Sequence, residues 1–225
     1  MKMWTQPTAA TEPTAVPVPT DPAGLRSGGQ GEPHAMTRSA GTAAVVVPPA
    51  GDYHLDPVRS AVTFRTRHLF GLGAVHGSFH IESGQIDVAD PPQASWARVT
   101  IPAASFHTGH SGRDSAVRSQ RLLAADVHPD ITFTSTGLEL LEARWVLHGR
   151  LSVRGFAGPV DVDLDEAHWD GSCLSLRASA HIDRYAFGIT GAKGLAGRHL
   201  SLRLSIVAGQ IPPRGDGQAR RGIRP

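Results

Sequence analysis

Apolar and polar residues alternate along much of the chain beyond residue 60. The clearest case is 199–206 (HLSLRLSI), where leucines and an isoleucine fall on one face and histidine, serine and arginine on the other. A period of two residues is typical of a half-buried β-strand, because successive side chains point to opposite faces. On this criterion we predict about nine strands, at 61–66, 75–83, 96–101, 131–135, 137–141, 145–154, 160–165, 174–182 and 199–206.

One window has a helical period instead. Within 113–125, Val117, Leu122 and Ala125 recur at helical spacing, and either Ser111 or Asp114 is a candidate N-cap. We therefore expect one short helix in this region.

Many short strands with a single helix predict an all-β protein, either an antiparallel sandwich or a closed barrel. Residues on the expected inward rows are small at Gly149, Ala178 and Ala180, and the chain holds only seven Phe, four Trp and two Tyr. A small barrel is either filled by its own side chains or has room for one ligand, and small inward residues favour the second case. Ordinary core packing of these small residues is the alternative.

Proline and glycine divide the chain into three parts. Eight of the 17 prolines lie in residues 1–50, and 209–225 is again rich in Gly, Pro and Arg. Such segments have few backbone donors and little apolar surface to offset the entropy of ordering. We expect 1–50 and 209–225 to be disordered and 51–208 to form the folded domain.

Charge and cysteine content narrow the function classes. The 51–208 segment is slightly negative and the excess positive charge lies in 209–225, so we do not expect nucleic acid as a partner. With Cys173 as the single cysteine, neither an intramolecular disulfide nor a cysteine zinc cluster can form. No apolar run of the length a secretory signal needs follows the early lysine, so we expect a cytoplasmic location. Among the 12 histidines, His107 and His110 are the best-spaced pair, but the sequence places no third ligand near them, and we expect neither a metal nor a cofactor.

Six short motifs occur in a fixed order along the chain. They are 56–64 (DPVRSAVTF) with 67–69 (RHL), 75–79 (VHGSF), 105–109 (SFHTG) with 113–114 and 118–119, 128–136 (HPDITFTST), 149–155 with 159–160, and 182–184 with 187–189. In this order and spacing they resemble the YceI-like family of lipid-binding proteins, and the resemblance spans nearly all of 53–207. Leu122 and Leu123 stand where phenylalanines are frequent in that family.

The resemblance implies an extended, antiparallel, lipocalin-like β-barrel without an established catalytic activity. It implies that the hydrophobic interior holds a long amphiphile, such as a polyisoprenoid, an isoprenoid quinone or a fatty amide. The expected function is therefore non-enzymatic binding, transport or storage of such a lipid.

Matching the motifs to the family implies two sets of ligand-binding residues. Those expected at the apolar wall or mouth are Phe64, Phe79, Phe133, Leu151, Val153, Leu176, Ala178 and Phe187. Those expected to face a polar headgroup are His68, Arg113, Asp114 and Arg184. The alternatives are plain core packing for the first set, and for the second a helix cap at Asp114 and structural ion pairs of the arginines.

Two other function classes stay open. In one, the protein is an enzyme or redox-coupled protein that acts on a bound lipid or quinone, with His68, His107 and Arg113 near its head. In the other, a filled barrel is the scaffold of an interaction domain and the proline-rich N-terminus binds partners.

The expected partners are an isoprenoid or similar lipid and, through the basic 209–225 segment, transiently an anionic membrane surface. Whether two chains form a homodimer through edge strands stays open as well.

Overall fold

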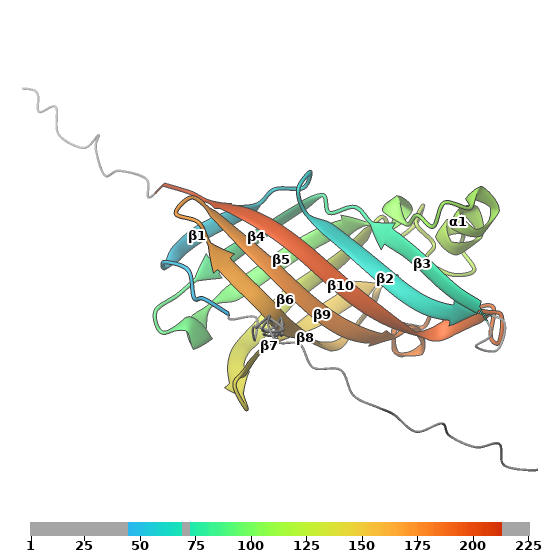
Figure 1. Ribbon diagram of the computed structural model, residues 1–225. Coiled ribbons are helices and arrows are strands. Elements are labelled where there is room, and N and C mark those ends of the chain that lie inside the picture. Colours follow the sequence, from blue (N-terminus) through green and yellow to red (C-terminus); the bar gives the residue numbers. More distant parts are fainter. Residues whose placement is uncertain (1–44, 69–72, 213–225) are drawn as a thin grey trace, which may run out of the picture. The chain divides into compact units, whose positions relative to one another are not determined.

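The computed structural model of the protein describes residues 45–68 and 73–212. Ten strands form one antiparallel sheet (Figure 1). Their bounds are β1 Gly51–Leu55, β2 Ala61–His68, β3 Gly73–Phe79, β4 Ser83–Val88, β5 Trp96–Pro102, β6 Asp130–Leu141, β7 Arg144–Val153, β8 Phe156–Trp169, β9 Cys173–Asp183 and β10 Ala196–Gln210. The helices are α1 Ser111–Arg118 and three short 3-10 turns, η1 Pro92–Ala94, η2 Ala103–Ser105 and η3 Arg184–Phe187.

The sheet closes into a barrel through β10. The strand order is β1-β4-β5-β6-β7-β8-β9-β10-β2-β3, and β1 also pairs with β10. The last residues of β10 pair with β1, as in Leu55↔Ala208, whereas its earlier residues pair with β2, as in Phe64↔Leu202. Strands β1 and β4 to β10 therefore form a closed eight-stranded barrel, and β2 with β3 extends its wall at one end. The predicted all-β barrel is confirmed.

The alternation of the sequence appears directly in β10. Ser201 and Arg203 are exposed on the outside, whereas Leu200, Leu202 and Leu204 face inward and pack on the core. The hydrophobic effect fixes this register, because a shift of one residue would turn every leucine to water.

The strand prediction was wrong in two respects. β1 (GDYHL) and β4 (SGQIDV) were missed, because each has only two large apolar residues and no clear alternation. The ranges 131–135 and 137–141 are one strand, β6, in which the register with β7 shifts between Ser135 and Gly137. Such an irregularity adds a residue to one strand and interrupts the period of two.

The helix prediction was right in kind and wrong in extent. α1 begins at Ser111 rather than at 113, and its N-cap is His110, whose ring Nδ1 accepts a hydrogen bond from the Arg113 amide at 3.3 Å. The helix ends at Arg118, and the following residues continue in turns, with Ala124 in the left-handed region at φ 50°. Leu122 to Ala125 are buried, so their spacing reflects burial in a compact loop and not a helix. None of the helices in the described ranges is long and apolar enough to cross a membrane.

The connections gather at two ends of the barrel (Figure 1). The α1 end carries α1, the 119–129 segment, the β7–β8 turn and the 184–195 segment. The opposite end carries η1, the β6–β7 and β8–β9 turns, and residues 45–48, which we call the strap. We call this second end the strap end. Residues 1–44 and 213–225 lie outside the described ranges, so the disorder expected for most of 1–50 and 209–225 stays a prediction.

Candidate functional site

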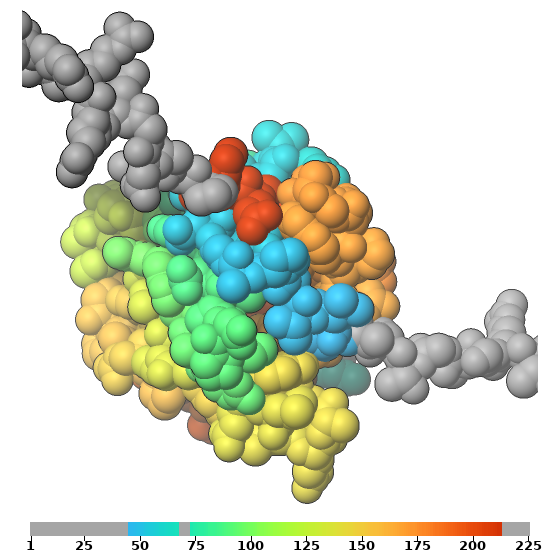
Figure 2. Space-filling view, turned by 90° about the vertical axis from the view of Figure 1, so that its left-hand side faces the viewer, coloured from blue at the N-terminus to red at the C-terminus, as the bar shows by residue number. Residues whose placement is uncertain are grey.

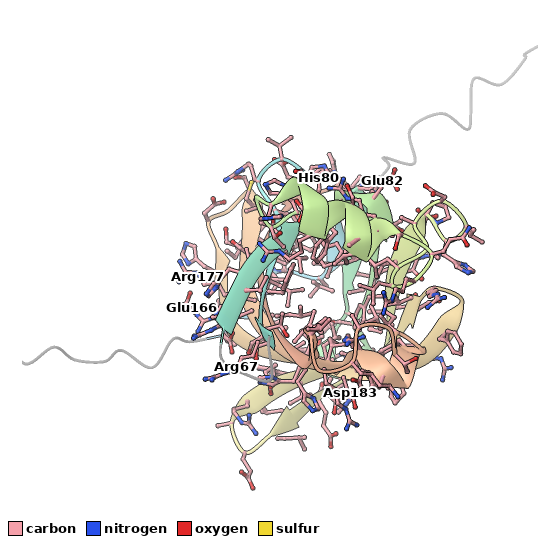
Figure 3. All side chains as sticks on the ribbon, turned by 90° about the vertical axis from the view of Figure 1, so that its right-hand side faces the viewer. Arg67, His80, Glu82, Glu166, Arg177 and Asp183 are labelled. Atoms are coloured by element: carbon pink, nitrogen blue, oxygen red, sulfur yellow. The ribbon has the colours of Figure 1, made fainter. Side chains whose placement is uncertain are left out.

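An apolar cavity of about 300 Å³ lies at the α1 end of the barrel. Its wall comes from β2, β3, β10, α1 and the segments on either side of the helix and before β10. The large apolar side chains that line it are Phe64, Val75, Phe79, Phe106, Val117, Leu122, Leu123, Ile189, Leu195 and Leu200. Figure 3 views the molecule from this end, where α1 crosses above side chains that point into the barrel.

Three phenylalanines form one side of the cavity. Phe106 stacks on Phe64 with ring centroids 5.2 Å apart and meets Phe79 edge-on at 5.4 Å. Gly77 of β3 allows this packing, because a Cβ there would clash with the Phe64 ring and with the carbonyl oxygen of His107. The His107 backbone pairs with Ser78 of β3 through hydrogen bonds of 2.8 and 3.0 Å, and this pairing brings Phe106 under the helix.

Side chains do not fill the barrel interior beyond the cavity. Leu202 and Leu204 face inward and yet are only half-buried, whereas the outward Arg203 between them is exposed. In a barrel whose interior is filled by side chains, inward residues lose nearly all of their solvent-accessible surface. These two leucines therefore border space that side chains do not completely occupy.

Arg113 lies at the cavity wall with several N–H groups that have no partner in the described ranges. Its Nε donates to the Thr108 hydroxyl at 2.7 Å, and its Nη2 lies 3.5 Å from the Thr108 carbonyl oxygen. Its Nη1 has no hydrogen bond with any residue in the described ranges. The side chain is half-buried at the cavity wall, so this free donor can reach the polar end of a bound molecule.

Asp114 positions Arg113 and does not line the cavity. Its carboxylate accepts hydrogen bonds from the Thr108 hydroxyl at 2.5 Å and the Thr108 amide at 3.0 Å, and His107 lies 3.4 Å away. Burial by itself would raise the pKa of Asp114, but the Thr108 hydrogen bonds and the charges of His107 and Arg118 together lower it. Asp114 thus remains ionised and ties α1 to the Thr108 loop.

Arg184 borders the cavity with four of its five N–H donors engaged. It is 7% exposed, and its guanidinium donates to the carbonyl oxygens of Ile189, Gly191, Ala196 and Gly197. Burial lowers its pKa from the usual arginine value. These hydrogen bonds fold the 189–197 segment around one side chain, so Arg184 shapes the cavity wall.

The remaining residues of the two sequence-derived sets lie elsewhere. Val153, Ala178 and Phe187 are buried in the core, and Phe133 and Leu151 pack against it without lining the cavity. Leu176 lines a different cavity, at the strap end. His68 ends β2, and its side chain lies outside the described part of the chain. Of the twelve residues, the cavity brings together Phe64, Phe79, Arg113 and Arg184.

The sequence reasoning did not single out several cavity residues. Phe106 lies within the 105–109 motif, and Leu122 and Leu123 occupy positions where the family often has phenylalanine, so both signals were present in the sequence. Arg118, also in a motif, donates to the Phe106 carbonyl oxygen at 2.5 and 3.2 Å and fixes that aromatic residue in place. Leu200 and Leu195 had no such signal.

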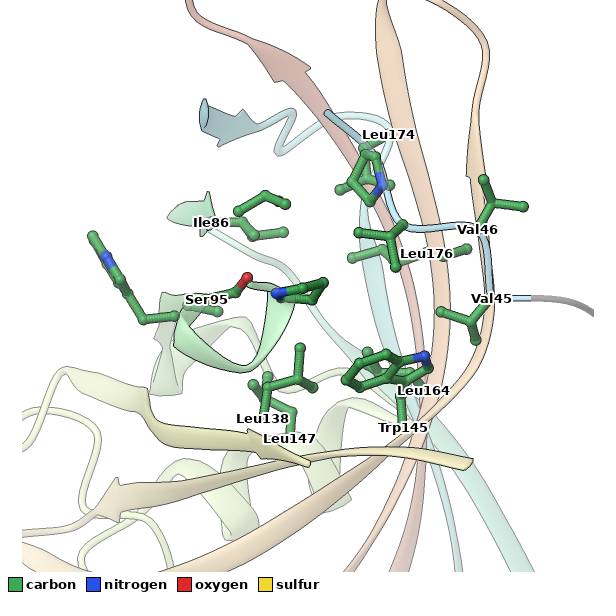
Figure 4. Close-up of a pocket in the computed structure, with 17 residues that line it drawn as sticks. Val45, Val46, Ile86, Ser95, Leu138, Trp145, Leu147, Leu164, Leu174 and Leu176 are labelled. Atoms are coloured by element: carbon green, nitrogen blue, oxygen red, sulfur yellow. The ribbon is translucent and has the colours of Figure 1, made fainter. Parts of the chain in front are cut away.

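The strap covers a second, smaller apolar cavity of about 100 Å³ (Figure 4). Its walls include Trp96, Trp145, Leu138, Leu164 and Leu174. The strap residue Val46 donates its amide hydrogen to the Ala167 carbonyl oxygen at 3.1 Å. Figure 2 shows this end of the molecule, with the blue start of the described chain lying among green and orange segments.

Between residues 45 and 212, outside the 69–72 gap, no three His, Cys, Asp or Glu side chains are grouped so that they could hold a metal ion.

The fold and site define a closed antiparallel barrel with an apolar internal cavity beside a single helix. The model of the YceI-like domain matches residues 53–208, and the chain belongs to this family. A UPF0312 protein of Serratia proteamaculans is 30% identical over 181 residues, which cover 76% of this chain and 91% of that protein. The protein YceI of Salmonella arizonae is 28% identical over 165 residues, 70% of this chain and 86% of that one.

Two solved structures share the fold. Burkholderia cenocepacia BcnA superimposes with a TM-score of 0.62 at 21% identity, covering 68% of this chain and 98% of that one. A polyisoprenoid binding domain from Saccharophagus degradans, implicated in plant cell wall breakdown, superimposes with a TM-score of 0.55 at 14% identity. That match covers 72% of this chain and all of the neighbour.

Proposed function

We propose that this protein binds and holds the chain of a long amphiphile, such as a polyisoprenoid, in the cavity beneath α1, and carries or stores it. The observation that supports this most is the combination of an unfilled apolar cavity with Arg113, whose Nη1 has no partner among the described residues. Family membership and the polyisoprenoid binding domain among the structural neighbours agree with it.

Burial of the lipid chain supplies the binding energy in this proposal. Each methylene removed from water contributes about 0.8 kcal/mol, so three prenyl units of five carbons contribute roughly 12 kcal/mol before the cost of ordering. Micromolar affinity requires about 8 kcal/mol, which leaves a margin for the entropy lost on binding. The cavity needs no catalytic group to reach this affinity.

Arg113 selects the polar end of the ligand in this proposal. A guanidinium group donates well to phosphate or to a quinone carbonyl, and the Thr108 and Asp114 contacts hold it at the cavity wall. The proposal assigns no chemical step to the bound lipid. His107, which the redox-coupled alternative places near the lipid head, pairs with Asp114 and does not line the cavity.

The first test is direct identification of the ligand. The full chain is purified from its host without detergent, extracted with organic solvent and analysed by mass spectrometry. We expect a prenyl or acyl species in about equimolar amount. A protein that carries no lipid and takes up neither farnesol nor farnesyl phosphate would contradict the proposal.

A matched pair of variants locates the site. Val117→Trp fills the cavity beneath α1 and should abolish farnesol uptake, because Val117 lines that cavity from the helix. Leu138→Trp fills the cavity at the strap end and should leave uptake unchanged. Both variants are checked by thermal unfolding, so that loss of uptake is compared only between folded proteins.

A further inference from the structure

Three loops at the α1 end lie beside the cavity and contact one another. They are 119–129, 154–156 and 188–195, and we call them the rim. Gly191 lies against Arg121 and Leu122, Gly188 lies against the Phe156 ring, and Gly155 lies beside the His128 ring. The first and third loops also contribute cavity residues, so the rim borders the cavity itself.

Each rim loop exposes one large apolar side chain. Val127 is 60% exposed, Phe156 52% and Leu195 57%. Single exposed apolar residues are common on protein surfaces, but three on adjoining loops around an apolar cavity form a group. Leu195 both lines the cavity and reaches the surface, and so provides a continuous apolar path between the two.

Each rim loop also carries one cation. These are Arg121, Arg154 and Lys193, and none of the three forms an ion pair with another residue of the described ranges. Lys193 lies 5.5 Å from the Tyr185 ring centroid. The rim carries a single carboxylate, Asp126, so its charge is positive on balance.

The strap end differs in the charge of its three turns. It too exposes apolar side chains, among them Val46 and Leu140, each 50% exposed. However, its three turns carry the carboxylates Asp90, Glu142 and Asp170. Hydrogen bonds from the amides of Cys173 and Ser172 lower the pKa of Asp170, which keeps it ionised. Apolar exposure alone does not distinguish the ends, whereas charge does.

We propose that the rim is a docking surface for an anionic phospholipid membrane, and that docking turns the cavity toward the bilayer from which the lipid is taken. This inference rests on the proposed function. Basic side chains near an anionic leaflet and apolar side chains at its interface both favour binding, and of the loops and turns in the described ranges those of the rim offer the two together. The strap end would be repelled by the same surface.

Vesicle flotation of the full chain tests the proposal. Vesicles of phosphatidylglycerol and phosphatidylcholine in equal parts should bind the protein, and vesicles of phosphatidylcholine alone should bind it more weakly. Neutralising Arg154 or Lys193 with Gln should each lower the partition coefficient by about five-fold, and Phe156→Glu should lower it further. Leu140→Glu is the matched control at the strap end and should leave partition unchanged, because Leu140 is as exposed as Phe156.

Three results would overturn the rim proposal. One is equal partition of the rim variants and the wild type, and the second is an equal loss for Leu140→Glu. The third is loss only when Arg214, Arg220, Arg221 and Arg224 are replaced by Gln, which would assign membrane contact to the basic segment beyond β10. Farnesol uptake, measured without vesicles, separates the two proposals: uptake without vesicle binding refutes the rim alone, and vesicle binding without uptake refutes lipid carriage alone.

Discussion

Arg184 is the side chain on which the cavity wall depends most. It lies in η3, is almost completely buried and donates to four carbonyl oxygens between Ile189 and Gly197. The 189–197 segment has few other backbone partners, so these hydrogen bonds define its path. The informative perturbation is Arg184→Met, which keeps an unbranched apolar stem of similar shape and removes every donor.

The structure sets the size of the effect. Four carbonyl oxygens lose their donor, and each buried polar group left unsatisfied costs about 1–3 kcal/mol. Because the segment lies near the surface, water will donate hydrogen bonds to some of these carbonyl oxygens once the loop relaxes. We therefore expect a loss of about 3–5 kcal/mol in the free energy of unfolding, which is less than the sum of four fully unsatisfied carbonyl groups. For a domain of this size the unfolding midpoint falls by about 10 °C.

Urea and thermal unfolding of the wild type and Arg184→Met measure this loss. Arg198→Met is the control, since Arg198 is an exposed neighbour whose ion pair with Asp183 is 2.6 Å long and exposed ion pairs contribute about 0–1 kcal/mol. Arg184→Lys should recover little, because an ammonium group cannot reach all four carbonyls at once. If Arg184→Met costs no more than Arg198→Met, the carbonyl cluster does not stabilise the wall and the reasoning is refuted.

Three further predictions concern other parts of the barrel. Gly77→Val should destabilise the domain by several kcal/mol and abolish farnesol uptake, because the valine side chain would displace the aromatic residues beside the cavity. Urea unfolding measures the first effect and an uptake assay the second. Hydrogen bonds from Arg198 lower the pKa of Asp183 from 3.8 to about 2. The stability that this pair contributes is therefore present above pH 3.8 and lost as the pH falls toward 2. In Asp183→Asn, the free energy of unfolding should depend less on pH between 3.8 and 2 than in the wild type. The hydrogen bond with Asp161 raises the pKa of His148, so the stability that this pair contributes is complete below about pH 6.5 and is lost as the pH rises through the raised pKa. If the free energy of unfolding of His148→Gln falls with pH above 6.5 as steeply as that of the wild type, this prediction is wrong.

Period-two alternation was sufficient to predict most of the barrel. Wherever a strand has one apolar face, as in β10, that face is buried in the core, and the alternation in the sequence predicts it. β1 and β4 were not predicted, because each has only two large apolar residues. These two strands are the ones that close the barrel, so the choice between sandwich and barrel came from the family resemblance and was settled by the β1–β10 pairing.

The candidate site depended on the tertiary structure to a greater degree. Motif matching found Phe64, Phe79 and Arg113, which line the cavity, but it grouped them with Phe133 and Phe187, which do not line it. An inward-facing apolar residue has the same sequence signature whether it packs against protein or faces an empty space. That difference arises from the residues opposite it across the barrel, which are remote in the sequence.

Local spacing was enough to predict the strands with a clear apolar face and a short helix, and motifs in order were enough to indicate the family. Three further properties came from the tertiary structure. They are the set of apolar side chains around the cavity, the engagement of four Arg184 donors while Nη1 of Arg113 has no partner in the described ranges, and the placement of the rim cations and of the carboxylates of the strap-end turns at opposite ends. Those properties depend on which loops the closed barrel brings to the same end, and no local pattern records that arrangement.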